Sequence, residues 1–425
     1  MTGLPDGWVM ATLNEVLEPQ ARGRLLEQGW SPQCLKEASE DSTVWGVLKT
    51  TAIQPGSFLA EHNKRLPDHL DPRPGIEVQV GDLLLTCAGP RSRCGIPTLV
   101  RNTRPRLMIS GKMYRFRAKA SVMEPTFLEK YLLSPLAQRA IDDMKTGVSD
   151  SGLNLTHERF LRLEVPVPPL DEQRRIVAIL EDHLSRLDAA SAGLQRAAQQ
   201  ALMLRRSAIE HCRDEASEYP QTTIMTVADL GRVTSGATPL KSNRAYYEGG
   251  AIPWVTSADL SGGDVTRPKQ FITERALTET SVKLIPAGSL LVAMYGEGKT
   301  RGTVAELQFE ATTNQACAAI IFNAEHEGLR EWVKLLLEAN YFGLRRMASG
   351  GVQPNLSVGL IKALPLPIPP MAVVRDLVNR ARSASEGAFR ARGAVLEAEA
   401  RGKALRRALL ASAFTGSLAK ESSLV

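Results

Sequence analysis

The sequence is poor in the residues that hold small secreted or metal-stabilised folds together. Its 425 residues include five cysteines, which form no CxxC pair and leave an odd count. This pattern argues against a disulfide framework and against a structural zinc site. The cysteines are Cys34, Cys87, Cys94, Cys212 and Cys317. A chain of this length can bury a large core without such supports.

Long apolar runs and a leader-like start are also missing. No apolar run in the sequence approaches the roughly 20 residues that a membrane-spanning helix needs. Residues 1–20 show no basic region followed by an apolar core, as a secretory signal would. We therefore expect a reduced, cytoplasmic protein of two to three domains with no membrane partner.

Catalytic motifs are scarce as well. The six histidines are scattered, no GxSxG elbow is present, and no GxGxxG both follows a strand and opens a helix. Residues 289–300 read SLLVAMYGEGKT and resemble an NTPase phosphate loop, but Ala293 stands where that pattern requires glycine. A β-like stretch also follows, where the phosphate loop should open a helix. We predict a binding or scaffolding protein with no catalytic residue, no metal ligand and no cofactor. The alternative is a P-loop-like NTPase with a coiled-coil arm.

The positive charge is small in total but unevenly distributed. The net charge is +6, yet residues 91–119 hold nine Arg or Lys and no Asp or Glu. Clustered arginines are typical of a surface that binds a polyanion. A solvated strand face is the plainer interpretation of the same stretch.

The chain contains an internal repeat. Shifted by 201 residues, Asn154 meets Asn355, and the prolines at 166, 168 and 169 meet those at 367, 369 and 370. Farther on, Leu204-Arg205-Arg206 meets Leu405-Arg406-Arg407 without a gap. Upstream blocks match more weakly at offsets that drift. The sequence therefore predicts a tandem duplication, in which a variable block precedes a block of fixed length.

Each fixed-length block is predicted to be one long helix that begins after its prolines. Apolar or small residues recur in steps of four and three, which is the pattern of a coiled-coil seam. The seam residues that we expect to pair the helices are Ile176, Leu180, Leu187, Leu194, Leu204, Leu377, Val395, Leu405 and Leu409. The simplest partner for each helix is the helix of the other copy. The sequence pattern alone does not choose between parallel and antiparallel pairing.

The variable blocks are predicted to be mixed α/β domains. In the first block, strands are expected at 81–88 and 108–117 and a helix at 125–144. In the second, strands are expected at 252–255, 269–272, 289–295 and 316–322, and a helix at 329–339. The predicted domain organisation is a first domain at 1–168, a helix at 169–217, a second domain at 218–369 and a second helix at 370–425. The fold class is therefore α+β.

This order of blocks resembles the specificity subunit of type I restriction–modification enzymes over nearly the whole chain. The stretches PVPPLDEQRRIVAIL and PLPIPP are similar to the family's boundary between a target-recognition domain and a conserved helix. LRRALLASAFTGSL is similar to its closing segment. SGATPLKSNRAYYEGGAIPWVTSADL, FITERAL, LIPAGSLLVAMYGEGKTRG and ATTNQA occur in the order of one type of target-recognition domain. The second helix departs from the family, since it opens with MAVVRD.

The resemblance implies that each domain reads one half of a bipartite site on double-stranded DNA. It favours antiparallel helices, which would set the spacing between the half-sites and bind two modification (methyltransferase) subunits. Those partners would carry S-adenosylmethionine, and restriction/translocase subunits would bring ATP and Mg²⁺. This chain itself would be non-catalytic.

The candidate DNA contacts are basic, amide, hydroxyl and tyrosine side chains of the two domains, because these groups reach base edges and phosphates. In the first domain they are Arg91, Arg93, Arg101, Arg104, Arg106, Lys112, Tyr114, Arg115 and Arg117. In the second they are Thr238, Lys241, Asn243, Arg244, Tyr246, Tyr247, Thr256, Ser257, Lys269, Tyr295, Lys299, Thr300 and Arg301.

Several residues leave two interpretations open. Asn314 and Gln315 could read a base or be buried structural amides. Trp254 fits a core position better than a stacking platform. The arginine pairs at 205–206 and 406–407 could follow DNA or be solvated helix residues.

Overall fold

A computed structural model describes residues 5–20, 23–296, 300–347 and 356–415. The chain divides into two compact units. Unit 1 comprises Met1–Gly193 and Glu397–Val425, and unit 2 comprises Leu194–Leu396. The helices within the described residues include none that is long and apolar enough to cross a membrane.

Unit 1 is a mixed α/β fold around a four-stranded sheet of order β2-β11-β7-β9. Its short elements are β1 (Val9–Thr12), α1 (Leu13–Val16), β2 (Glu27–Gln28), β3 (Gly46–Leu48), β4 (Ile53–Gln54), β5 (Ser57–Phe58), β6 (Asn63–Arg65), β7 (Leu83–Thr86), β8 (Ala88–Gly89), β9 (Pro97–Leu99), β10 (Leu107–Met108), β11 (Met113–Phe116), α2 (Pro125–Leu133), α3 (Pro135–Met144), β12 (Leu153–Asn154), α4 (His157–Leu161) and β13 (Glu164–Val167). The predicted helix at 125–144 is in fact two helices. Pro135 starts the second one, and the Ser134 side chain caps it by accepting from the Ala137 amide at 3.2 Å.

Unit 2 repeats this design with a four-stranded sheet of order β15-β21-β18-β19 and a three-stranded sheet β17-β16-β20. Its short elements are β14 (Thr223–Thr226), α6 (Val227–Leu230), β15 (Gly231–Ser235), β16 (Ile252–Val255), β17 (Phe271–Ile272), α7 (Glu274–Glu279), β18 (Leu290–Ala293), β19 (Val304–Glu306), β20 (Thr312–Thr313), β21 (Cys317–Phe322), α8 (Arg330–Ala339), α9 (Tyr341–Met347), α10 (Val358–Lys362) and β22 (Pro365–Ile368). The core includes Trp332 of α8, whose indole donates to the Pro367 carbonyl at 2.9 Å.

Both units begin in the same way, which confirms the tandem repeat. β1 pairs antiparallel with β13 in unit 1, and β14 pairs antiparallel with β22 in unit 2. A capping box follows each first strand: Thr12 with Glu15 in unit 1, and Thr226 with Asp229 in unit 2. This box fixes the start of the short helix after each strand by satisfying its free amides.

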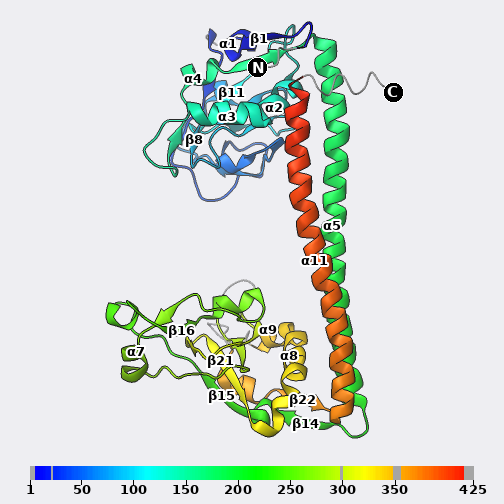
Figure 1. Ribbon diagram of the computed structural model, residues 1–425. Helices are drawn as coiled ribbons and strands as arrows, with labels where there is room; N and C mark the ends of the chain where they lie inside the picture. Colours follow the sequence, from blue (N-terminus) through cyan, green and yellow to red (C-terminus); the bar gives the residue numbers. More distant parts are fainter. Residues whose placement is uncertain (1–4, 21–22, 297–299, 348–355, 416–425) are drawn as a thin grey trace. The chain divides into compact units, whose positions relative to one another are not determined.

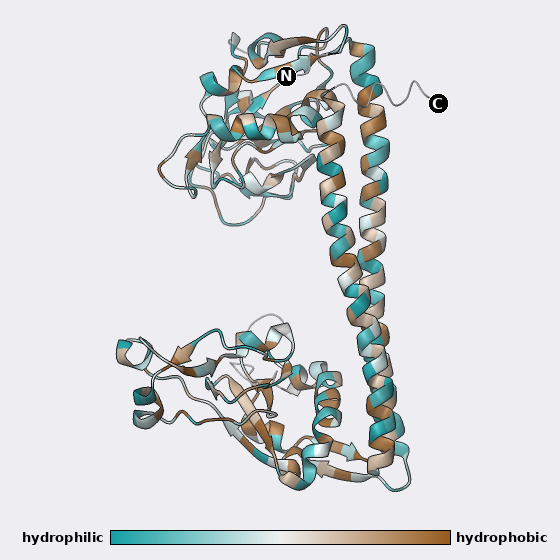
Figure 2. Cartoon of the chain, viewed as in Figure 1, coloured by the Kyte–Doolittle hydropathy of each residue, from teal (hydrophilic) through white to brown (hydrophobic). Residues whose placement is uncertain are grey.

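Two long helices, α5 (Leu170–Glu218) and α11 (Met371–Ala413), contribute to both units. In unit 1, Ile176 and Leu180 of α5 share the core with Leu410 and Ala413 of α11. In unit 2, the end of α5 meets the start of α11, where the Cys212 thiol lies 3.7 Å from the Leu377 carbonyl oxygen. The pairing is therefore antiparallel (Figure 1). Hydrophilic and hydrophobic residues are interspersed along both helices (Figure 2).

Burial agrees with some of the predicted seam positions and contradicts two of them. Ile176, Leu180, Leu377 and Val395 are buried, while Leu187, Leu194 and Leu409 are half-buried. Leu204 and Leu405 occupy the same place in the repeat, and they are 70% and 50% exposed. A straight helix drifts by about 20° per heptad from a 3.5-residue repeat. Four heptads after Ile176 this drift approaches one residue, so that Arg205 takes the inward place predicted for Leu204.

The predicted α+β fold class, with two mixed α/β domains in tandem and an antiparallel helix pair, is confirmed. The two compact units differ from the predicted four segments, because each long helix is shared between units. The four domain boundaries therefore stay a prediction.

Candidate functional site

Unit 2 carries a polar pocket of about 580 Å³ beside the sheet β17-β16-β20. Four separated segments build it, and all but one of its lining side chains are polar or aromatic. The lining residues are Thr238, Lys241, Tyr247, Trp254, Thr256, Ser257, Ala258, Gln270, Asn314 and Gln315. We call this cavity the polar pocket.

Two hydrogen bonds from aromatic side chains, those of Trp254 and Tyr247, hold the loop at 236–241. The Trp254 indole donates to the Ala237 carbonyl at 3.3 Å, and the Tyr247 hydroxyl donates to the Pro239 carbonyl at 2.6 Å. The two rings meet edge to face, with centroids 5.9 Å apart. Trp254 is only 4% exposed, so it is a core residue that supports the pocket. Burial also raises the pKa of the Tyr247 hydroxyl.

No carboxylate lines the polar pocket within the described residues. The nearest acid in sequence, Asp259, is fully engaged: the Thr256 amide and hydroxyl donate to it at 2.9 and 2.8 Å, and Lys269 lies 3.1 Å away. Burial alone would raise the pKa of Asp259, but the Thr256 hydrogen bonds and the Lys269 ammonium together lower it below its ordinary value. The pocket is therefore suited to a ligand rich in hydrogen-bond acceptors.

Asn314 and Gln315 lie in the turn between β20 and β21 with their amide oxygens already occupied. The Asn314 Oδ1 accepts from the Ala316 amide at 3.2 Å, and the Gln315 Oε1 accepts from the Thr238 hydroxyl. Asn314 is half-buried and Gln315 is exposed. The side-chain NH₂ groups of both residues remain as donors at the pocket. The sequence left their role open, and it gave no signal for Gln270, which lines the same pocket.

The other predicted residues of unit 2 lie outside the pocket lining. Asn243 accepts from the Ala245 amide at 3.2 Å, and the Tyr246 hydroxyl donates to Glu279 at 3.2 Å. Arg244 is exposed, 3.8 Å from Glu248, and Lys269 is paired with Asp259. The remaining ones are Tyr295, which is exposed, and Thr300 and Arg301, which are half-buried before β19. Lys299 lies outside the described residues.

The loop that resembled an NTPase motif leads into a strand. Residues 300–303 form a turn, and β19 begins at Val304. A phosphate loop needs a helix N-terminus at this point, because the helix amides hold the phosphates. The NTPase alternative therefore has no support.

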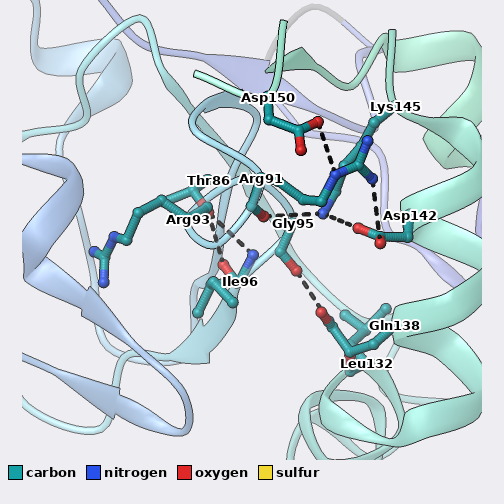
Figure 3. A network of polar contacts seen from close by, with 10 residues as sticks. All are labelled: Thr86, Arg91, Arg93, Gly95, Ile96, Leu132, Gln138, Asp142, Lys145 and Asp150. Carbon is teal, nitrogen blue, oxygen red and sulfur yellow. Dashed lines mark hydrogen bonds and ion pairs between the residues drawn. The ribbon is translucent and has the colours of Figure 1, made fainter. Parts of the chain in front are cut away.

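Unit 1 shows that a stretch without acids in sequence can be surrounded by acids in space. Arg91 lies between Asp142 and Asp150, at 3.3 and 3.1 Å (Figure 3). Arg101 makes two hydrogen bonds to the fully buried Glu129, at 3.2 and 2.6 Å. Arg117 lies 2.7 Å from the buried Asp82. These three candidates remain partly exposed, but each fastens its segment to another part of the unit.

Two candidates of unit 1 are buried, and their prediction as DNA contacts is wrong. Tyr114 is 4% exposed and donates to the Leu155 carbonyl at 2.6 Å. Arg115 is 7% exposed and donates to the Gly75 and Glu77 carbonyls. Both residues lie in β11, which pairs with β2 on one side and with β7 on the other.

The remaining arginines of the stretch bind backbone carbonyl groups. Arg93 donates to the carbonyls of Thr50 and Ile53, and Arg104 to that of Ser39. Arg106, exposed and with a positive φ of 61°, donates to the Thr43 carbonyl. Lys112 is exposed in the turn just before β11. Most arginines of this stretch therefore hold segments of unit 1 together through hydrogen bonds and ion pairs within the unit.

Replacing Arg101 with alanine is expected to destabilise unit 1. It removes two hydrogen bonds to the buried Glu129 carboxylate, which keeps the Leu99 amide at 2.6 Å and Lys130 at 3.8 Å. A hydrogen bond to a charged group contributes about 1.5–3 kcal/mol. Urea unfolding, followed by amide exchange in β7 and β11, measures this change. Lys112→Ala is the matched control and should change stability by less than about 0.5 kcal/mol. Equal effects of the two variants would contradict the assignment.

The arginine pairs of the long helices have divided roles. Arg205 bonds Glu338 and Ser385 within unit 2, and Arg406, at the equivalent place in the repeat, bonds Asp188 within unit 1. These two residues hold helices together. Arg206 pairs with Glu210 at 2.9 Å on its own helix, and Arg407 is exposed.

Unit 2 has two further cavities that suit a polyanion less well. The larger, about 790 Å³, is lined by the acids Asp264, Glu338 and Glu386 as well as by basic and apolar residues. The smaller, about 420 Å³, is lined mainly by apolar groups of α8 and β22, with Arg213 at its side. Among the cavities described, the polar pocket is the best candidate for recognition.

Comparison with known proteins identifies relatives that match about half of the chain. The chain is 34% identical over 201 residues to the type I restriction enzyme EcoEI specificity subunit of Escherichia coli, covering 47% of this chain and 33% of that protein. It is 25% identical over 216 residues to the EcoR124I/EcoR124II specificity subunit of Escherichia coli, covering 49% and 52% of the two chains. The alignments thus span a third to about half of these relatives.

Solved structures share the fold over nearly the whole chain. One from a study of complex assembly in a type I R-M system aligns with a TM-score of 0.72 at 21% identity, covering 98% of this chain and 100% of that one. The HsdS subunit from Thermoanaerobacter tengcongensis aligns with a TM-score of 0.53 at 20% identity, covering 97% and 98%.

The family model for the type I restriction modification DNA specificity domain matches residues 101–196 and 221–373. The two matches cover more than half of the chain and fall on both copies of the repeat. The chain therefore belongs to the type I restriction modification DNA specificity family.

Proposed function

We propose that this chain is the sequence-specific DNA-binding subunit of a type I restriction–modification complex. Each compact unit reads one half of a bipartite site, and the paired helices set the gap between the halves. The chain itself performs no catalysis. Membership of the specificity family is the observation that carries this proposal.

The design of the two units supports a bipartite reader. They share one plan, but their surfaces differ: unit 2 has the donor-lined polar pocket, whereas arginines of unit 1 are tied to its own acids. Two different readers joined by continuous helices specify two different half-sites at a fixed separation, because half-site spacing follows protein geometry. Exposed cations such as Lys112 and Lys241 are suited to phosphates, which position a protein without specifying sequence.

The partners and cofactors follow from this role. Two modification subunits would bind the helix pair and methylate adenine with S-adenosylmethionine, after the base leaves the stack. Restriction subunits would use ATP and Mg²⁺ to translocate and cut the DNA. This chain would hold none of these cofactors, and the complex would act in the cytoplasm, where it meets DNA.

Mapping methylated adenines in host DNA, with and without this chain, tests the proposal. We expect one bipartite motif to be methylated in its presence and to disappear on its deletion, with the modification subunit still expressed. Binding of the purified complex to that motif should weaken steeply with salt, as phosphate contacts require. A methylation pattern that is unchanged by deletion would contradict the proposal.

A further inference from the structure

We propose that the polar pocket of unit 2 reads a guanine in its half-site through the side-chain amide groups of Asn314 and Gln315. This inference rests on the proposed function, since it names the base that one recognition unit prefers. Both residues lie in one turn at the pocket.

The orientation of Asn314 is fixed by the backbone. A main-chain N–H can only donate, so the atom that receives the Ala316 amide at 3.2 Å must be the Asn314 oxygen. The Asn314 main-chain N–H donates to the Val255 carbonyl at 3.0 Å, which anchors the residue to the end of β16. Its NH₂ group is therefore held at the pocket as a donor, and it has no acceptor among the described residues.

Gln315 and Lys241 add donors to the same pocket. The Gln315 oxygen accepts from the Thr238 hydroxyl, which leaves its NH₂ group to donate. Lys241 brings an exposed ammonium group, which has three donors and no acceptor. With no lining carboxylate among the described residues, the converging polar groups of the pocket are mainly donors.

Guanine is the base whose major-groove edge matches these hydrogen-bond donors. In the major groove it presents two adjacent acceptors, N7 and O6, whereas adenine pairs one acceptor with an N6 donor and cytosine presents its N4 donor. Reading adenine would require the oxygen of Asn314 or Gln315 to turn toward the base, and each oxygen already accepts a hydrogen bond inside the protein. Thymine offers one acceptor beside a methyl group. A phosphate also accepts hydrogen bonds, but it carries no sequence information.

Asn314→Asp is the sharpest test, carried out in the full complex of this chain with its modification subunit. The substitution keeps the shape of the side chain and lets one oxygen still accept from the Ala316 amide, but it turns the outward donor into an acceptor. We expect preference for guanine at one position of one half-site to fall by about ten- to hundredfold, the discrimination of a good side-chain contact. Preference for cytosine should rise there, because aspartate accepts from its N4 group.

The readout is the methylated motif in host DNA, together with binding of the complex to duplexes that differ at one base. Asn323→Asp is the matched control, since it makes the same chemical change at an exposed position of unit 2 outside the pocket. It should leave every position of the motif unchanged. Replacing the preferred guanine with 7-deazaguanine, which lacks the N7 acceptor, should weaken binding of the unaltered complex at that position.

The outcomes separate the two proposals. A wild-type complex that shows no bipartite motif would overturn the proposed function itself. A wild-type motif that Asn314→Asp leaves unchanged would overturn the guanine assignment alone. A uniform loss of affinity for all sequences would show that Asn314 binds phosphate, and it would equally overturn the assignment.

Discussion

Inserting four residues into each long helix is expected to widen the gap between the two half-sites by one or two base pairs and to leave the bases of each half unchanged. The insertions belong between Gly193 and Leu194 in α5 and between Leu396 and Glu397 in α11, where the compact units meet along the chain. Each unit then keeps its own core and its own helix contacts.

The expected size follows from helix geometry. Four helical residues add about 6 Å, and they turn the helix by about 40° beyond one full turn. DNA advances about 3.4 Å per base pair and makes one turn in about 10 base pairs. One or two added base pairs therefore match both the translation and the rotation, if the helix pair runs along the duplex as the proposed function requires.

A seven-residue insertion at the same places is the matched control. It adds about 10.5 Å, close to three base pairs, but it leaves the helix about 20° short of two full turns. Three base pairs of DNA turn by about 100°. The two readers would then face the duplex out of phase, and we expect binding to be lost even though the heptad is kept. Methylated-motif mapping measures both variants. An unchanged gap after the four-residue insertion would show that the helices do not set the spacing.

Sequence and structure agree most closely where the pattern is local. The repeat, the long helices and strands such as β16 and β21 are visible in the sequence, because periodicity, prolines and glycines act within a few residues. Even there, one prediction was wrong: Leu204 was expected to face the other helix, but it is exposed, and the inward position falls one residue later, at Arg205. The reason is that helical drift accumulates over several heptads.

The candidate site could be predicted only in part, because its surroundings come from distant segments. The arginine stretch contains no acid, and yet Asp82, Glu129 and Asp142 reach it from outside. The count of charges along the sequence therefore overestimated how many arginines of this stretch have no acidic partner. In unit 2, Thr238, Lys241 and Thr256 were among the predicted contacts, and the polar pocket brings them together. The hydrogen bonds to the oxygens of Asn314 and Gln315 could not be predicted from the sequence, since one depends on a local turn and the other on Thr238, 77 residues away from Gln315.

Replacing Phe414 with alanine is expected to lower the stability of unit 1 by about 3–5 kcal/mol, the usual cost of removing a buried aromatic side chain. Phe414 follows the end of α11 and is 3% exposed. Its ring meets those of Phe127 and Tyr131 edge to face, with centroids 5.2 Å away in both cases. It belongs to the same core as Ile176 and Leu180 of α5, so its loss would leave a cavity where α2 and both long helices meet.

Amide exchange can assign this effect to one unit. A loss of 3–5 kcal/mol corresponds to a fall in protection of roughly 10²- to 10³-fold or more, since each 1.4 kcal/mol is about tenfold. We expect the fall in β7 and β11 of unit 1, with β18 of unit 2 much less affected. Phe389→Ala is the control, because Phe389 is a phenylalanine of α11 that is 77% exposed, and it should change stability by less than about 0.5 kcal/mol.

The repeat itself explains why Phe414 matters to one unit only. Shifted by 201 residues, Ala413 corresponds to Cys212, which is buried like its counterpart, but Phe414 corresponds to Arg213. Arg213 lines the cavity of about 420 Å³ against α8, whereas Phe414 packs against α2. Unit 1 thus gains from the residue after α11 an aromatic contact that has no counterpart at Arg213 among the described residues of unit 2. Equal loss of protection in both units after Phe414→Ala would contradict this asymmetry.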